Sequence, residues 1–470
     1  MKRFTVKRHT ARHSLAALFV LATSTLASAQ PVDIPPTWGG SFWDRPRLTG
    51  GWFGLRDDLG KKGVVLDVDV TQFPQGVITG GVDDIAKYGG LAEYTLNVDT
   101  QKLGLWPGGF FKIQGMTNFG QNVTTAAGAL VPLNITALVP EPGKDTTGLM
   151  NLSYMQFFSK YFGVVVGKLY TLGGDENAFA HNFRSTFFYT GLDLNLTLDL
   201  FPFTAYGGTF VMLPWDGARF TVGVIDPDGK AGNNDISEAF SEGVLVTAEG
   251  RVRVKPFGLV GHQTVGFGWS DKERIQINQD PSNIARQFVK NQFPRLIDPG
   301  PIVRKLMERF LPELLVPTQP LKTVNYTWAI YYNFDQYLWS PEGRPDDGIG
   351  LFFRFGASDG VANPVKYAYN VGIGGKGIVP RRPDDSFGIG WAHTQLSGNF
   401  VPFLRQALNI GLEKEDAVEI YYNAAITRWL TATLDLQIVN AAFTKALDSS
   451  GQLKDVNTAV VAGLRLYARF

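Results

Sequence analysis

A two-residue alternation of apolar and polar side chains is the feature that most constrains how this chain folds. Residues 192–200 (LDLNLTLDL) place leucine at every second position, with a polar residue between each pair. Successive side chains of a β-strand point to opposite faces of the sheet, whereas a helix would spread these leucines around its circumference. The pattern therefore predicts a strand over 192–200 with one apolar face and one wet face.

The same alternation recurs elsewhere in the chain, at residues 64–70, 92–99, 244–254, 324–334 and 431–440. It also fits an antiparallel sandwich with one solvated side. However, several of the runs approach the roughly 9–11 residues that a tilted membrane strand needs, whereas globular strands average about 5–6. We therefore expect an all-β fold, namely a transmembrane antiparallel β-barrel of about 16 strands with a water-filled lumen.

Aromatic residues stand at the ends of many apolar faces, as they do in the girdles of membrane barrels. The candidates for such girdles are Tyr94, Phe201, Phe203, Trp328, Phe334, Trp391 and Trp429.

The N-terminus has the layout of a secretory signal peptide. Five basic residues precede an apolar run at 15–26, and Ala27-Ser28-Ala29 follows as a small-x-small cleavage site. The apolar run is shorter than the roughly 20 residues of a spanning helix, which argues against a membrane anchor. We expect a signal peptide at 1–29 and a single barrel domain at 30–470.

Composition excludes several classes of function. The chain has no cysteine, so thiol catalysis and thiolate metal sites are excluded. Without the five basic residues of the signal peptide, 39 basic residues stand against 43 acidic ones, a formal charge of −4. This mildly acidic balance gives no reason to expect a nucleic-acid partner.

No catalytic arrangement is evident in the mature chain. Its histidines, His181, His262 and His393, do not have metal-ligand spacing, and Gly-x-Ser-x-Gly does not occur. His181 lies close in sequence to Ser185, but a solvated loop explains that pair better than a hydrolase site. We therefore predict no catalytic residue, no metal site and no cofactor.

Two stretches do not look like strands. Residues 48–63 predict a short amphipathic helix that ends at Gly63, within an N-terminal extension at 30–63. Residues 281–315 predict a long, partly helical loop insertion. The sequence leaves open whether this insertion is an extracellular loop, a lid or a loop folded into the lumen.

The last strand is predicted to run to the final residue, Phe470. A terminal Phe on an alternating strand resembles the assembly signal of bacterial outer-membrane proteins, although the usual second aromatic position is Ala468 and Tyr467 is out of phase. The barrel-assembly machinery is therefore an expected partner.

Several segments resemble the OprB-like family of carbohydrate-selective porins of bacterial outer membranes. They are residues 334–338 (FDQYL), 343–350 (GRPDDGIG), 350–356 (GLFFRFG), 363–364 (NP), 374–390 (GGKGIVPRRPDDSFGIG), 429–430 (WL) and, near the start, 54–56 (GLR). The resemblance implies a 16-stranded barrel in the outer membrane, surrounded by lipid and lipopolysaccharide. It also implies passive diffusion of monosaccharides and similar polyols past inward-folded loops. Whether the barrel works as a monomer or a homotrimer stays open, as does the identity of the solute.

Alternation supplies the candidate residues of the pore. Those predicted to face the lumen are Asp67, Asp69, Glu93, Asp99, Asp193, Asp199, Glu249, Arg251, Arg253, Arg354 and Asp435. A second cluster carries the family motif: Arg381, Arg382, Asp384 and Asp385. The alternative for that cluster is a turn held by local ion pairs and Asx hydrogen bonds.

Three other functions remain open at this level. The first is a general or organic-anion-selective channel on the same barrel, which an arginine cluster with few carboxylates would favour. The second is an outer-membrane hydrolase with a Ser–His–acid set. The third is a secreted soluble β-protein that binds glycans.

Overall fold

The computed structural model describes residues 34–141, 145–172, 176–198, 201–279, 321–399, 413–447 and 453–470. The expected signal peptide at 1–29 and the expected insertion at 281–315 lie outside these residues. Within the described part of the chain, no helix is long and apolar enough to cross a bilayer.

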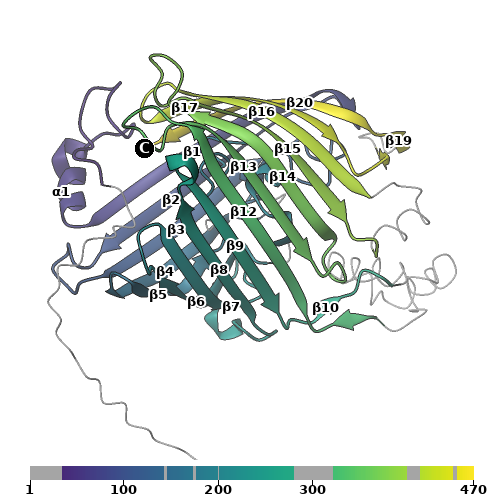
Figure 1. Cartoon of the computed structure of the whole chain (residues 1–470), viewed down its shortest axis with the longest axis horizontal. Helices are drawn as coiled ribbons and strands as arrows, with labels where there is room; N and C mark the ends of the chain where they lie inside the picture. The colour runs from purple at the N-terminus through teal and green to yellow at the C-terminus, as the bar shows by residue number, and fades with distance from the viewer. Residues whose placement is uncertain are drawn as a thin grey trace, which may run out of the picture.

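Sixteen antiparallel strands of described residues follow one another around a closed barrel (Figure 1). The first strand, β1, also pairs with the last, β20, and this pairing closes the sheet. Closure leaves no unpaired edge, which is the condition for strands to cross a lipid bilayer. In order, the barrel strands are β1 (Val64–Gly81), β2 (Ala86–Asp99), β3 (Gly109–Gly120), β4 (Thr147–Ser159), β5 (Phe162–Tyr170), β6 (Thr204–Met212), β7 (Ala218–Ile225), β8 (Leu245–Val254), β9 (Gly261–Ser270), β12 (Thr327–Trp339), β13 (Gly348–Ser358), β14 (Val365–Lys376), β15 (Ser386–Leu396), β16 (Lys414–Ala425), β17 (Leu430–Asn440) and β20 (Asn457–Arg469).

Alternation sorts the side chains of each strand into an outer apolar face and an inner polar face. On β17, Leu434 is 63% exposed, and Leu436 and Ile438 follow it at every second position. Their neighbours Thr433 and Gln437 are buried inside the barrel. Apolar exposure on this scale marks a surface that lipid covers in the native setting. The prediction of a transmembrane barrel of about 16 strands is confirmed.

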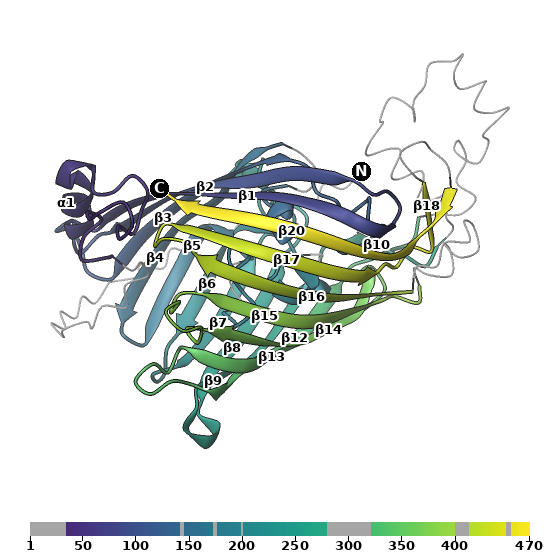
Figure 2. The same cartoon turned by 90° about the horizontal axis from the view of Figure 1, so that it is seen from above.

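The two ends of the barrel carry connections of different length. At the end where β1 begins and β20 finishes, short turns such as residues 160–161 join the strands; we call this the turn end. At the opposite end, which we call the loop end, the connections include residues 121–146 and 171–203. Two small hairpins of described residues also lie at the loop end (Figure 2): β10 (Arg274–Ile275) with β11 (Thr323–Val324), and β18 (Lys445–Leu447) with β19 (Leu453–Asp455).

The N-terminal extension packs against the turn end, beside the C-terminus (Figure 1). It contains the 3-10 turn η1 (Trp52–Gly54) and the helix α1 (Leu55–Lys61). The short helix predicted over 48–63 is therefore present but shorter than expected. Gly63 follows it with φ +79°, a left-handed conformation that glycine adopts without strain and that ends the helix.

A single arginine of α1 joins the two ends of the sheet. Arg56 is buried, and its Nη2 donates to the backbone oxygens of Leu66 (2.8 Å) and Phe470 (3.1 Å) and to the carboxylate of Asp67 (2.8 Å). The extension therefore holds the first and last strands together where the barrel closes.

The predicted strand over residues 192–200 is wrong. Its described residues, 192–198, lie in the 171–203 loop, where they include the end of α2 (Thr190–Asp193) and the 3-10 turn η3 (Leu196–Leu198). The other short turns of the described residues are η2 (Ile135–Leu138), η4 (Ile236–Glu238) and η5 (Pro256–Gly258). The two-residue period predicted strands of the sheet correctly elsewhere in the chain. The same period also occurs in this loop, whose side chains meet different surroundings on its two sides.

Two of the predicted girdle aromatics are also placed differently. Phe201 and Phe203 lie near the end of the 171–203 loop and line a space inside the lumen. In contrast, Tyr94 and Trp391 are exposed on outward-facing positions of β2 and β15, as predicted.

Candidate functional site

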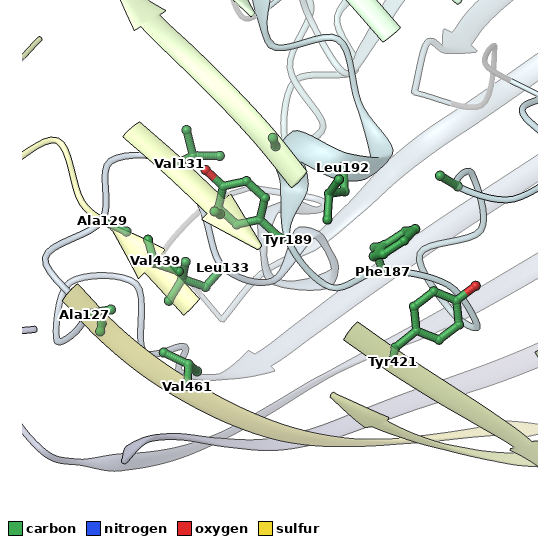
Figure 3. Close-up of a cluster of buried hydrophobic side chains, with 14 of the residues drawn as sticks. Ala127, Ala129, Val131, Leu133, Phe187, Tyr189, Leu192, Tyr421, Val439 and Val461 are labelled. Atoms are coloured by element: carbon green, nitrogen blue, oxygen red, sulfur yellow. The ribbon is translucent and has the colours of Figure 1, made fainter. Parts of the chain in front are cut away.

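Two loops from the loop end fold back into the lumen and pack against its wall. The first is the 121–146 loop between β3 and β4, and the second is the 171–203 loop between β5 and β6. Leu133 of the first and Leu192 of the second are buried in one apolar cluster with Val439 of β17 (Figure 3). The interior of the barrel is therefore narrowed by protein rather than open across its full width.

Two glutamates of β16 bind the backbones of these loops. Glu415 accepts hydrogen bonds from the backbone N–H groups of residues 130 and 131 (2.7 and 3.1 Å). Four residues along the same inward face, Glu419 accepts them from residues 188 and 189 (2.6 and 2.8 Å). Each carboxylate thus satisfies two backbone donors that a loop away from water would otherwise leave unpaired.

Two arginines of the wall bind backbone oxygens of the 171–203 loop. Arg354 of β13 is 1% exposed and donates to the oxygens of Leu192 (2.6 Å) and Ala180. Arg465 of β20 donates to two further oxygens of the same loop (2.7 and 2.6 Å). Arg354 points inward, as its strand phase predicted, but it holds the loop in place and has almost no contact with lumen water.

Asp193 is buried between the 171–203 loop and the wall. It is 1% exposed, and the hydroxyl of Thr186 donates to its Oδ1 (3.3 Å), while Oδ2 has no hydrogen-bond partner among the described residues. Burial raises the pKa of Asp193 to about 7, although the charges of Arg354 and Arg465 act in the opposite direction. Asp193 was expected to face lumen water on a strand, and its burial in a loop corrects that expectation.

An ion pair connects the 171–203 loop to β2. Arg184 of the 171–203 loop donates two hydrogen bonds to the carboxylate of Glu93 on β2. Burial lowers the pKa of Arg184, but the charge and hydrogen bonds of Glu93, together with smaller effects of other neighbours, raise it by more in total, so the guanidinium stays charged. Glu93 was predicted to face the lumen, and the structure places it on the inner face of β2.

A second ionic cluster lies on β7 and β8. Arg219 contacts Glu176 of the 171–203 loop (2.5 Å) and Glu249 (3.2 Å), and Arg251 contacts Glu176 (3.3 Å). The hydroxyl of Tyr331 donates to Glu249 (2.7 Å). The two arginines and two glutamates of this cluster carry no net charge, and their paired groups present both donors and acceptors.

The 171–203 loop separates two spaces inside the barrel. Toward the turn end lies a space of about 670 Å³, lined by loop residues such as Asn177 and Ser185 and by Asn423 of β16. Along β6–β8 lies a second space of about 550 Å³, lined by Leu194, Thr221 and Glu249 among others. The ionic cluster borders the second space through Glu249, and its Glu176 is the neighbour in sequence of Asn177, which lines the first space.

The family-motif cluster forms a turn between β14 and β15. The guanidinium of Arg382 contacts Asp385 (2.8 Å), which also accepts hydrogen bonds from Tyr422 and from the backbone of Ala425. Burial raises the pKa of Asp385, but these hydrogen bonds lower it by more, so it lies below its ordinary value. The turn interpretation is therefore the one that the geometry favours, with Arg381 at φ +65° within it. Asp384 lines the space at the turn end.

The remaining residues that were predicted to face the lumen differ in their surroundings. Asp67, near Asp69 on the inner face of β1, binds the N-terminal extension through Arg47 and Arg56. Asp99 accepts backbone hydrogen bonds in the turn after β2, and Arg253 contacts Asp216 of the turn before β7. Asp435 is buried and accepts from Gln437. Asp199 lies outside the described residues.

The residues that hold the loops were not all found from the sequence. Glu415, Glu419 and Arg465 were missed, although each falls on the inner phase of an alternating strand. A search of residues 414–425 for the same alternation would have placed both glutamates on one face. In contrast, Glu176 and Arg184 come from a loop, where no periodicity predicts a direction. The described residues contain no group of three or more potential ligands that could hold a metal ion.

The closed barrel and its charged, loop-narrowed lumen define the class of the molecule: a porin-type channel. The family model described as carbohydrate-selective porin, OprB family, matches residues 84–470, so the chain belongs to the OprB family. The family and the barrel place the protein in the outer membrane.

Individual relatives agree with this assignment. Porin B of Pseudomonas aeruginosa is 25% identical over 148 residues, which are 29% of this chain and 31% of that porin. The match therefore spans about a third of the curated relative's length. The high-pH structure of Pseudomonas putida OprB has a TM-score of 0.72 at 20% identity, over 92% of this chain and 100% of that chain. The low-pH structure of the same protein has a TM-score of 0.52 at 17% identity, over 91% and 99%. At these identities the two structures show the fold alone.

Proposed function

We propose that the chain is a passive channel through which monosaccharides and similar small polyols cross the outer membrane. The observation that carries the proposal is the paired ionic cluster of Glu176, Arg219, Glu249 and Arg251 beside the lumen spaces. Sugar hydroxyls both donate and accept hydrogen bonds, and a surface that offers guanidinium donors next to carboxylate acceptors suits both. Family membership supports the same solute class.

The balance of charge argues against the organic-anion alternative. A channel that attracts anions needs positive groups whose charge is not cancelled nearby. Here Arg219 and Arg251 contact carboxylates, and Arg184 contacts Glu93. These paired arginines therefore favour neutral solutes over anions at the ionic cluster.

The test is liposome swelling with purified protein, comparing glucose, a disaccharide and gluconate. We expect fast swelling with glucose and slower swelling with the other two. Swelling that follows solute size alone would support a general porin. Absence of swelling with a correctly folded barrel would overturn the channel proposal.

A charge variant tests the role of the ionic cluster. Glu249→Gln leaves the cluster with a net positive charge, so we expect gluconate to enter faster relative to glucose. The control is Glu342→Gln, which makes the same chemical change at an exposed position of the turn after β12. An unchanged ratio in the Glu249 variant would remove this cluster from the account of selectivity.

The proposal includes the route to the membrane. We infer that residues 1–29 direct export and that the barrel-assembly machinery inserts the chain through its final strand, β20. The proposed transport implies no catalysis, cofactor or energy coupling. Deleting residues 2–29 is expected to leave the protein in the cytoplasm, which cell fractionation would show.

A further inference from the structure

Some leucines of the 171–203 loop border open space inside the lumen, whereas Leu192 is buried in the apolar cluster. The polar residues between these leucines contact the barrel wall. Asn195 donates to Asn333 of β12 (3.0 Å), and the side chain of Thr197 packs on the backbone of Gly356 in β13. Leu194 and Leu198 are left lining the space of about 550 Å³ beside β6–β8. Among the described residues, Leu192 and Leu196 pack against buried apolar clusters, but Leu194 and Leu198 do not.

Other apolar side chains extend this surface. Leu138 of the 121–146 loop and Phe201 and Phe203 line the same space. The two phenylalanines also pack against buried apolar clusters, but Leu138, Leu194 and Leu198 are absent from the clusters of the described residues. Apolar groups left open to water cost free energy, and a contiguous patch of them marks a binding surface.

The opposite wall of the space is polar. Thr209 of β6, Thr221 of β7 and Thr247 of β8 line it. Gly223 lies between the first and third of these threonines: a Cβ added there would come within 2.7 Å and 3.0 Å of their hydroxyl oxygens. The absence of a side chain at Gly223 therefore leaves the hydroxyls open toward the lumen. Glu249 continues this wall into the ionic cluster.

We propose that this space binds neutral glycosides whose aglycone is an aromatic ring. The ring would lie on the leucine surface, and the sugar would face the threonine hydroxyls and the ionic cluster. A volume of about 550 Å³ falls within the range of roughly 300–1,000 Å³ that small-molecule sites occupy. The inference rests on the proposed function, since it names a subclass of carbohydrate solute that the channel binds more tightly than free sugar.

The test is block of ion current through the channel in planar bilayers by phenyl β-glucoside, glucose and phenol. We expect phenyl β-glucoside to block at a concentration at least about tenfold lower than glucose or phenol, because it fills both walls at once. Equal half-blocking concentrations for phenyl β-glucoside and glucose would overturn the inference.

Two leucine variants locate the site. Leu138→Asn and Leu194→Asn should each raise the half-blocking concentration of phenyl β-glucoside roughly three- to tenfold relative to that of glucose. Leu105→Asn, in the exposed turn after β2, is the matched control and should leave this ratio unchanged. Unfolding by heat, followed on gels, verifies that each variant forms a barrel. A ratio unaffected by both lumen variants would also overturn the inference.

Swelling with glucose separates this inference from the proposed function. A channel that passes glucose but shows no preferential block by the glycoside keeps the proposed function and loses the aglycone site. A barrel that is blocked by the glycoside yet passes no glucose keeps the site and loses the proposed function.

Discussion

The carboxyl group of Asp193 is buried with a pKa of about 7, against 3.8 for the ordinary side chain. Between these values the folded protein binds a proton that the unfolded chain does not. The contribution of Asp193 to stability is therefore full below about pH 4, and it falls as the pH rises through about 7. Linkage puts the whole change at up to about 4 kcal/mol.

We predict that Asp193→Asn flattens this pH dependence. The amide keeps the size of the side chain and does not ionise, so the variant should be less sensitive to pH than the wild type between pH 4.5 and pH 8. The measurement is the midpoint temperature of unfolding, followed by heat-modifiable gel mobility at both values. Equal shifts in the two proteins would show that Asp193 stays ionised in the fold.

Arg354 gives a second prediction at the scale of one residue. Arg354→Met removes the donors to two backbone oxygens of the 171–203 loop, which costs about 1–3 kcal/mol for each acceptor left unpaired. We expect a looser loop, a higher single-channel conductance and faster entry of disaccharides. Arg253→Met is the control, because Arg253 contacts Asp216 of a turn and not the loop. Equal conductance in both variants would contradict the anchoring role.

At the scale of elements, β16 holds both inward loops through two carboxylates: Glu419 binds the 171–203 loop alone, whereas Glu415 binds the 121–146 loop and also accepts from the hydroxyl of Tyr189 (3.0 Å). We predict that Glu419→Gln speeds amide exchange at residues 188–189 but not at 130–131. Glu415→Gln should speed exchange mainly at 130–131, with a smaller effect at 189 because the hydroxyl of Tyr189 also donates to Glu415. Losing about one charge-assisted hydrogen bond, on the order of 1.4 kcal/mol, corresponds to roughly tenfold faster exchange. Hydrogen exchange followed by mass spectrometry measures this.

Asp416→Asn is the matched control for these two variants. Asp416 lies on the same strand but on its outer face, where it contacts His393 (2.8 Å). It should change exchange in neither loop. If Glu419→Gln loosened both loops equally, the two loops would form one cooperative unit and not two separately held ones.

The strands also show which elements the sequence predicts well. The segments predicted at 64–70, 92–99 and 431–440 fall within barrel strands, and most of the segments at 244–254 and 324–334 falls within β8 and β12, respectively. Their alternation reflects one face toward lipid and one toward the lumen. The described residues 192–198 carry the same pattern in a loop. Asn195 and Thr197 meet the wall, Leu192 is buried in the apolar cluster, and Leu194 and Leu198 line open space.

At the scale of the whole molecule, Arg56 couples the N-terminal extension to both strands at the closure of the barrel. Arg56→Met should lower the midpoint temperature of unfolding, because the backbone oxygens of Leu66 and Phe470 lose this donor and Asp67 keeps only Arg47 among its described partners. Hydrogen bonds to charged groups contribute about 1.5–3 kcal/mol each. Lys61→Met, on the exposed side of the same helix, is the control. An unchanged midpoint in the Arg56 variant would mean that β1–β20 pairing alone closes the barrel.

The sequence by itself determined the class of fold, because a two-residue period repeated over long segments fits few structures other than a barrel with lipid outside and water inside. It also determined the inner phase of residues such as Glu93, Glu249 and Arg354. Only the tertiary structure decided what those residues do. Arg354 meets Ala180, 174 positions away in the sequence, because the loop folds into the lumen and its polar backbone needs partners on the wall. A two-residue pattern within one strand carries no information about such a distant contact. The alternation therefore predicted the strands of the barrel wall but not the loops that pack inside the lumen.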